Sequence, residues 1–230
     1  MKKEFFCLFD SVPKLIAPLF DSCDTPWELL SRLPDYLIEI TKNPPKGYSL
    51  LKPGIIAAEG AKIEEFSTMR APAIICRDAE IRQGAYLRGA VFLGEGAIAG
   101  HGTEMKNTVL MEGAKAPHLS YLGDSILGKN AHLGAGVILS NLRLDKGEIF
   151  VNLSALHSPE NAASQPNKKI PTGRRKLGSI IGDGAEIACG TVLNPGTIIP
   201  KNSMIFPKQN PRKQMLPSKQ NATIQYDVFK

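Results

Sequence analysis

This sequence of 230 residues is poor in the features that mark several common classes of protein. Aromatic residues make up 7% of it, with one tryptophan, which argues against a sandwich or a helical bundle packed on large side chains. It has no stretch of about 18 consecutive apolar residues, so no membrane-spanning helix is expected. It also lacks arginine-rich runs interleaved with aromatic residues, so nucleic acid is not expected as a partner.

Cysteine is scarce as well, and its spacing does not suit metal binding. No C-x-x-C pair occurs among Cys7, Cys23, Cys76 and Cys189. We therefore expect free thiols in a reducing compartment and no metal site. The apolar start of the chain is interrupted by Asp10 and Lys14, and no small-residue cleavage site follows, so a cytoplasmic location is expected.

Glycine and alanine, by contrast, are abundant, and they accompany a regular pattern. Aliphatic or small residues recur every six positions, broken by two steps of five and by one long gap. These residues are Ile63, Met69, Ile75, Ile81, Leu87, Leu93, Ala99, Met105, Leu110, Ala116, Leu122, Leu127, Leu133, Leu139, Ile181, Ile187, Leu193, Ile199 and Ile205. A small residue follows most of them four positions later, which is too regular for a chance recurrence.

A period of six fits neither the 3.6 of a helix nor the 2 of a simple strand. It fits short strands with turns between them, three strands to a coil, with the aliphatic residue pointing inward. We therefore predict an all-β fold, a left-handed parallel β-helix of hexapeptide repeats over residues 48–207. An excursion loop at about 142–178 would leave the stack at a corner and return, and residues 208–230 would form a basic tail.

Residues 1–47 follow a different, helical pattern. Thr25 is a suitable N-cap, Pro26 suits the first helical position, and Asn43-Pro44-Pro45 ends the pattern. One face carries Leu29, Leu30, Leu33, Leu37 and Ile40. We predict a short helical cap packed on one end of the β-helix, with a separate partner-docking module as the alternative.

Some residues within the repeat are not needed to build it. The polar ones spaced near multiples of a coil of about eighteen residues are Arg88, Lys106, His118, Tyr121 and Asn141. This spacing would bring them near one vertical edge of the β-helix. A histidine beside two cations suits a general base, and two cations with a tyrosine suit a phosphorylated ligand. A single charged residue on such a face is commonly just solvated, so the hypothesis rests on the joint arrangement.

The segments E-M-K-N, P-H-L-S-Y-L-G-D-S-I-L-G and H-L-G-A-G-V-I-L-S-N-L lie between residues 104 and 142. They resemble the acetyltransferase domain of the bifunctional glucosamine-1-phosphate acetyltransferase / N-acetylglucosamine-1-phosphate uridyltransferase family. They are more similar still to a sugar-nucleotidyltransferase-like branch that shares the Pro26-Trp27-Glu28 helix. The resemblance covers roughly residues 25–207. The glycine-rich L-x-x-G-x-G-T-R-M loop of the nucleotidyltransferase half is not found in the sequence, so no uridyltransferase activity is expected.

The resemblance implies an acetyl-coenzyme A-dependent N-acetyltransferase acting on an amino-sugar phosphate, in UDP-N-acetylglucosamine and envelope precursor synthesis. Glucosamine-1-phosphate is the acceptor that it suggests. It implies that His118 is the general base, that Arg88 and Lys106 hold the phosphate, and that Tyr121 orients the sugar. It further implies that Asn141 contacts the sugar or the acetyl group, and that the turn at Ala135 offers a backbone N–H to the thioester. The site would lie between subunits of a homotrimer.

Several positions depart from the family pattern and leave the acceptor open. His132, assigned here to substrate binding, replaces an asparagine, and Leu142 replaces a tyrosine. Cys189 replaces a serine that touches the cofactor, and the insert replaces a loop with a substrate lysine, for which Arg174-Arg175-Lys176 is the candidate. Two alternatives remain: a longer-chain sugar acyltransferase, and a non-catalytic trimeric β-helix that senses a sugar nucleotide or partners a separate sugar nucleotidyltransferase.

Overall fold

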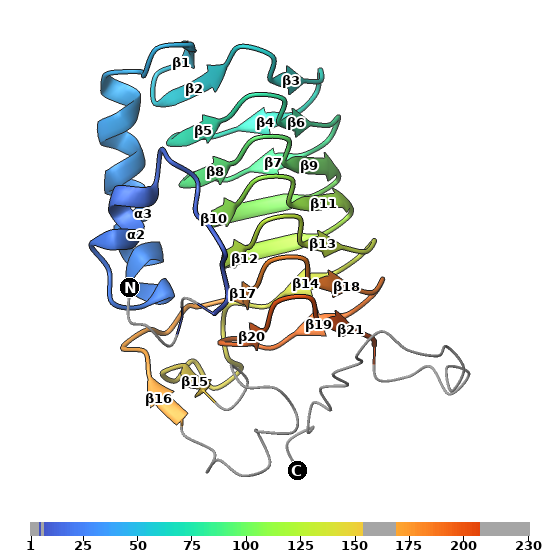
Figure 1. Cartoon of the computed structure of the whole chain (residues 1–230). Helices are drawn as coiled ribbons and strands as arrows, with labels where there is room; N and C mark the ends of the chain where they lie inside the picture. Colours follow the sequence, from blue (N-terminus) through green and yellow to red (C-terminus); the bar gives the residue numbers. More distant parts are fainter. Residues whose placement is uncertain (1–4, 6, 154–168, 208–230) are drawn as a thin grey trace.

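A parallel β-helix with three faces makes up most of the molecule (Figure 1). The computed structural model describes residue 5, residues 7–153 and residues 169–207. Each coil contributes one short strand to each face, and each strand pairs in parallel with strands of the neighbouring coils. The hexapeptide β-helix predicted from the sequence period is confirmed.

The strands fall into three stacks. Face 1 consists of β2 (Ile55–Ala58), β5 (Ala73–Ile75), β8 (Val91–Leu93), the second halves of β10 (Glu104–Leu110) and β12 (Tyr121–Leu127), β17 (Ile180–Ile181) and β20 (Ile198–Ile199). Face 2 consists of β4 (Thr68–Met69), β7 (Tyr86–Leu87), the first halves of β10 and β12, β14 (Ile138–Leu139) and β19 (Val192–Leu193). Face 3 consists of β3 (Lys62–Ile63), β6 (Glu80–Ile81), β9 (Ile98–His101), β11 (Lys115–His118), β13 (His132–Leu133), β18 (Glu186–Ile187) and β21 (Met204–Ile205). An antiparallel strand, β1 (Tyr48–Lys52), pairs with β2 and closes one end.

The inward positions of the three faces form one hydrophobic core. The aliphatic residues of the six-residue series all belong to it or pack against it, with Ile63 and Met69 only partly buried at the β1 end. Stacked coils hold this core together because strand N–H groups find their acceptors in a neighbouring coil, as Arg70 N does on Leu87 O at 2.8 Å. The period therefore predicted which side chains point inward.

The two steps of five mark tightened corners. Tyr86 pairs with Glu104 eighteen positions on, whereas Glu104 pairs with Tyr121 only seventeen positions on. Strands β10 and β12 consequently run from face 2 into face 1 without a break. Asn107 and Asp124 make the bends with φ of 50° and 46°, which asparagine and aspartate tolerate better than most residues.

Helix α3 (Pro26–Lys42) begins and ends where the sequence predicts. The Oγ1 atom of Thr25 accepts a hydrogen bond from the N–H of Glu28 at 3.2 Å, and Asn43 follows the last turn. A shorter helix that the sequence pattern did not indicate, α2 (Ala17–Asp21), precedes it. Neither helix, nor any other in the described residues, is long and apolar enough to cross a membrane.

The outward side of face 1 builds a second hydrophobic core. Its buried residues are Ile56, Ile74, Phe92, Val109, Ile126, Ile180 and Ile198. The apolar side of α3 packs on them, and the helix contacts β5, β10 and β12. It therefore lies alongside several coils (Figure 1), and the predicted position on one end is wrong. A helix on the end would leave this aliphatic column in water, at a cost of about 25 cal/mol for each Å² of apolar surface.

The insert leaves the stack and returns at a single corner. The N–H of Leu177 donates to the carbonyl oxygen of Asn141 at 3.0 Å, and Leu142 forms an antiparallel bridge with Lys176. Its strands β15 (Phe150–Asn152) and β16 (Lys169–Pro171) pair with each other, and Val151 joins the second core. The coils continue in register across it, as predicted. The expected tail, residues 208–230, lies outside the described residues.

Candidate functional site

From β4 to the first half of β12, face 2 carries polar side chains at positions where face 1 carries aliphatic ones. Its outward residues form two columns that run along the stack. The first column contains Thr68, Tyr86, Glu104, Tyr121, Ile138 and Val192. The second, two positions later in each coil, contains Arg70, Arg88, Lys106 and Gly123. Arg88 and Lys106 are thus stacked one coil apart, as their spacing predicted.

The contacts on face 2 join the two columns. The Nη1 atom of Arg88 lies 2.7 Å from Oε1 of Glu104, and this hydrogen bond raises the pKa of Arg88. Arg70 lies over the ring of Tyr86, 5.5 Å from its centroid. Burial is the main cause that raises the pKa of Tyr121, assisted by the negative charge of Glu104. The arginines therefore lean towards the coil that carries Tyr121.

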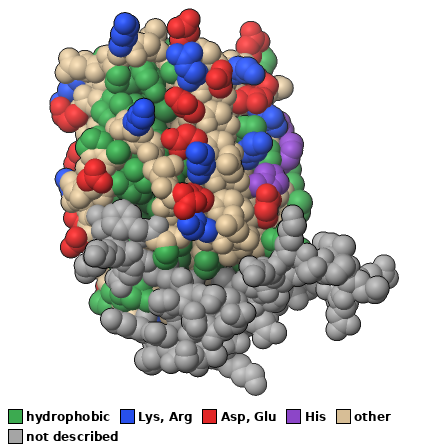
Figure 2. Space-filling model, viewed as in Figure 1, with side chains coloured by type: hydrophobic (Ala, Val, Ile, Leu, Met, Phe, Trp, Pro, Cys, Tyr) green, Lys and Arg blue, Asp and Glu red, His purple; other side chains and the backbone are tan. Residues whose placement is uncertain are grey.

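His118 is placed at the corner between faces 3 and 2. It ends β11, its side chain is exposed, and it pairs in register with His101 of the preceding coil. Figure 2 shows histidine side chains gathered along one edge of the molecule, on the side away from the helices of Figure 1. Gly100 allows these coils to approach, because a Cβ there would lie 1.7 Å from the carbonyl oxygen of Pro117.

The turn after His132 stacks on His118 in the next coil. The N–H of Gly136 donates to the carbonyl oxygen of His118 at 3.1 Å, and that of Gly134 donates to Ile187 O at 2.7 Å. Among the described residues, the N–H of Ala135 has no acceptor, so it is the amide of this turn that a ligand can use. Cys189 follows in the same column and is exposed.

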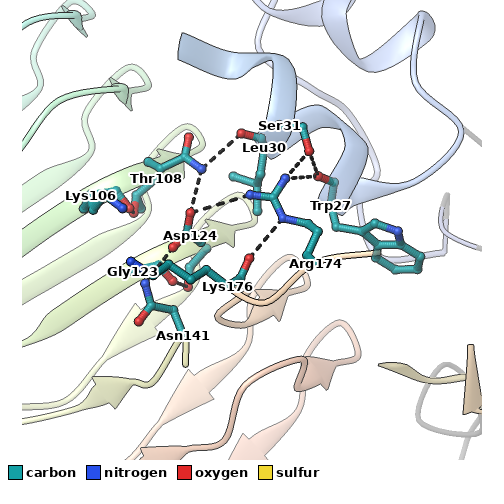
Figure 3. Close-up of polar contacts among 12 residues, drawn as sticks. Trp27, Leu30, Ser31, Lys106, Thr108, Gly123, Asp124, Asn141, Arg174 and Lys176 are labelled. Atoms are coloured by element: carbon teal, nitrogen blue, oxygen red, sulfur yellow. Dashed lines mark hydrogen bonds and ion pairs between the residues drawn. The ribbon is translucent and has the colours of Figure 1, made fainter. Parts of the chain in front are cut away.

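Asn141 lies at the opposite corner, between faces 2 and 1, within a buried polar network (Figure 3). Its Nδ2 donates to Oδ2 of Asp124 at 2.6 Å, and its Oδ1 accepts from the Tyr121 hydroxyl at 3.5 Å. Asp124 is 3% exposed, and its Oδ1 also accepts from Nδ2 of Asn107 at 2.8 Å. The network thus fixes the Asn141 amide against Tyr121.

Arg174 of the insert completes this network from outside the coils. Its Nη2 lies 3.8 Å from Asp124 Oδ1, and its Nη1 donates to Trp27 O at 3.0 Å and to Ser31 Oγ (Figure 3). Burial lowers the pKa of Arg174, and Asp124 opposes that shift. Its guanidinium ties α3 to the β-helix, so Arg174 is not available as the substrate cation considered from the sequence.

The expected gathering of the site at one vertical edge is therefore wrong in part. Arg88, Lys106 and Tyr121 share face 2, while His118 and Asn141 occupy the corners on either side of it. His132 lies on face 3, where its Nδ1 is 2.9 Å from Oε2 of Glu186. The spacing itself explains this spread, because Lys106 is in register with Gly123 and His118 precedes Gly123 by five positions, about one side of a coil.

Four residues of the candidate site were not predicted from the sequence, three on face 2 and one at the corner between faces 2 and 1. They are Arg70, Tyr86, Glu104 and Asp124. A signal existed for the first three, because Arg70 precedes Arg88 by one coil and Tyr86 precedes Glu104 by one coil. Asp124 had none, since its role depends on the bend that buries it.

Comparison with known proteins supports the resemblance seen in residues 104–142. A family model described as the GMPPB C-terminal domain matches residues 69–207. A bifunctional sugar-1-phosphate nucleotidylyltransferase/acetyltransferase of Sulfurisphaera tokodaii is 35% identical over 163 residues, 63% of this chain and 38% of that protein. The bifunctional protein GlmU of Methanococcus maripaludis is 33% identical over 183 residues, 78% of this chain and 41% of that protein. The chain spans less than half the length of these curated relatives.

Among solved structures, one match is the acetyltransferase domain of PglB from Neisseria gonorrhoeae in complex with acetyl coenzyme A. It overlaps with a TM-score of 0.28 at 13% identity, covering 66% of this chain and 53% of that chain. An overlap this loose carries no argument about this protein. The match that identifies a family is the family model, which covers more than half of the chain.

Proposed function

Starting from the fact that the chain belongs to the GMPPB C-terminal domain family, we propose that it is a sugar-directed acetyltransferase. It would transfer an acetyl group from acetyl-coenzyme A to the amino group of an amino-sugar phosphate, with glucosamine-1-phosphate as the first acceptor to test. The names of its curated relatives, which include a sugar-1-phosphate nucleotidylyltransferase/acetyltransferase, support this class of reaction. The product would serve UDP-N-acetylglucosamine and envelope precursor synthesis in the cytoplasm, where thiols such as Cys189 stay reduced.

One observation carries the proposal. An exposed histidine, His118, stands at the corner of a face whose outward residues include Arg88, Lys106 and Tyr121. A base within reach of a cationic, hydroxyl-bearing surface is what proton abstraction from a bound amino-sugar phosphate requires. The register and the exposure of these side chains make the arrangement accessible to a small molecule.

The residues would divide the work as follows. Acetyl-coenzyme A supplies the acetyl group as a thioester. His118 would take the proton from the acceptor nitrogen, Arg88 and Lys106 would hold the phosphate, and Tyr121 would orient the sugar. The free N–H of Ala135 would donate to the thioester carbonyl oxygen, whose charge grows during attack.

Further residues would act at the edges of this site. Asn141, held by Asp124 and Tyr121, would fix the position of the Tyr121 hydroxyl against the sugar or the acetyl group. Cys189 would line the cofactor side, in the column of Ala135. His132 would bind substrate only across a subunit boundary, since it faces outward on face 3.

A homotrimer is part of the proposal because the site is open to one side. Apolar side chains are exposed on the last coils, with Val192 60% exposed on face 2 and Met204 46% exposed on face 3. Burying such residues against a second copy would remove this surface from water. Sedimentation that finds a stable monomer at assay concentrations would exclude a site shared between subunits.

The test is thiol release from acetyl-coenzyme A in the presence of glucosamine-1-phosphate. Replacing His118 by alanine should lower kcat by about 100-fold or more, because a positioned general base contributes that much. His101→Ala is the matched control, since His101 is exposed and pairs with His118 one coil away. It should keep wild-type activity.

Three outcomes would overturn the proposal or part of it. Full activity in His118→Ala would remove the base assignment. A wild-type protein that is inert with all amino-sugar phosphates and with acyl-coenzyme A of every chain length would favour a non-catalytic β-helix, which could partner a separate nucleotidyltransferase. Activity only with longer acyl chains would indicate the sugar acyltransferase alternative.

A further inference from the structure

The cationic column of face 2 is longer than one phosphate group needs. Arg70, Arg88 and Lys106 occupy equivalent positions in three successive coils. Neighbouring coils are spaced by about 4.8 Å, so the column spans about 10 Å. A single phosphate monoester is too small to contact both ends of it.

Most of this positive charge is not compensated by the protein. Within the described residues, only Arg88 has a carboxylate partner, Glu104, while Arg70 contacts the ring of Tyr86 and Lys106 has no ion pair. On face 3, by contrast, Arg82 is paired with Glu80 at 2.9 Å. Like charges in neighbouring strands destabilise a sheet, so an uncompensated column indicates an anionic ligand that offsets the repulsion.

The column ends beside an apolar groove. The groove has a volume of about 490 Å³, and its lining includes Ala71 and Pro72, the two residues that follow Arg70. Ile38 and Thr41 of α3 form one wall, and Leu50 of β1 is part of the other. Passing along the stack, a ligand would meet this groove first, then the three cations, and then Tyr121.

We propose that the acceptor is a nucleoside diphosphate amino sugar rather than a sugar monophosphate. Its amino sugar would lie at Tyr121, its two phosphates along Lys106, Arg88 and Arg70, and its nucleoside in the groove beside Arg70. Tyr121 and Thr68 are three coils apart, about 14 Å at the spacing of parallel strands, which an extended nucleoside diphosphate sugar can span. The inference rests on the proposed function for its chemistry and names the substrate class of that site.

Acetyl transfer to UDP-glucosamine and to glucosamine-1-phosphate, compared on the full chain, provides the test. We expect kcat/KM to be at least about tenfold higher for UDP-glucosamine, the size of one or two charge-assisted hydrogen bonds. Arg70→Ala should remove about tenfold of kcat/KM for UDP-glucosamine and leave the monophosphate unchanged. Arg82→Ala, which removes an arginine from the same position on face 3, is the matched control and should change neither. Leu50→Trp, which narrows the groove, should also act on UDP-glucosamine alone.

Calorimetric binding of UDP needs no turnover, and it separates this inference from the proposed function. UDP binding that is weakened by Arg70→Ala in a protein without acetyltransferase activity would support the diphosphate site and reject the chemistry. Equal kcat/KM for the two acceptors would overturn the inference while the proposed function stands. So would an Arg70→Ala variant that loses both acceptors alike, or an absence of UDP binding.

Discussion

Faces 1 and 2 are built from the same repeat, yet they present opposite outer surfaces. The outward position of face 1 holds residues such as Ile74 and Phe92, and that of face 2 holds Tyr86 and Glu104 in neighbouring coils. Both faces share one inward core, and the continuous strands β10 and β12 join them in one sheet. The difference between them therefore resides in the outward side chains alone.

This difference assigns a task to each face. Face 1 is buried under α3 and the insert, and its outward residues therefore stabilise the fold about as much as ordinary core residues do. Face 2 has no such cover from α3 and keeps its charged and hydroxyl groups accessible. A β-helix can thus use one side to anchor accessory segments and another to bind ligands, without altering its coils.

The largest effect on stability should come from truncating a buried side chain on the outward side of face 1. Phe92 is fully buried there, so Phe92→Ala should lower the free energy of unfolding by about 3–5 kcal/mol, through lost burial and the cavity left behind. Thr68→Ala, at an exposed outward position of face 2, should change it by less than about 0.5 kcal/mol. Denaturant unfolding of both variants measures the contrast, and equal losses would contradict it.

Substitution at the corner between the two faces should lower the free energy of unfolding nearly as much. Asp124→Ala would leave the Asn107 and Asn141 amides and the Arg174 guanidinium without their shared acceptor, which should cost about 3 kcal/mol. The matched control is Asp145→Ala, whose carboxylate pairs with Arg143 on the surface, and which should have no measurable effect on unfolding. A silent Asp124→Ala would mean that the network does not join α3 to the coils.

A smaller effect on stability is expected at alkaline pH. It should distinguish Cys76, which is buried in the second core on face 1, from Cys189 at the exposed corner. Burial raises the pKa of the Cys76 thiol to about 12, against an ordinary value of 9.0. The unfolded chain would lose this proton near pH 9 while the folded chain keeps it. The associated stability is thus present below pH 9 and is lost as the pH rises towards 12.

This loss can be measured as the pH dependence of denaturant unfolding. At pH 10.5 it should amount to about 2 kcal/mol relative to pH 8. Cys76→Ala should flatten this part of the profile, whereas Cys189→Ala, at the exposed corner, should retain it. An unchanged slope in Cys76→Ala would show that other groups cause it.

The sequence was sufficient for the coils because their physics is local and periodic. Each inward residue, such as Leu87 or Leu133, is specified by its six-residue position, and the steps of five marked real corners at Asn107 and Asp124. The capping of α3 by Thr25 was equally local.

The packing of α3 on face 1 was not predicted, although the sequence contains a sign of it. Strands such as Val91-Phe92-Leu93 have three apolar residues in a row, so one of them must face outward. The six-residue series counts only inward positions and therefore passed over this column, and with it the place where α3 packs. Arg174 could not be assigned from the sequence, because its partners Trp27 and Asp124 are far from it along the chain.

The corner that carries the insert has a consequence for how this fold can change. Asn141 and Leu177 are joined by a hydrogen bond, so the segment between them is an insertion at one corner of a coil that closes without it. The closure entropy of such an insertion grows only with the logarithm of its length, so insertions of very different size are tolerated at similar cost. The surroundings of Tyr121 can then change by replacement of the insert, while the coils on both sides of it keep their strand pairing.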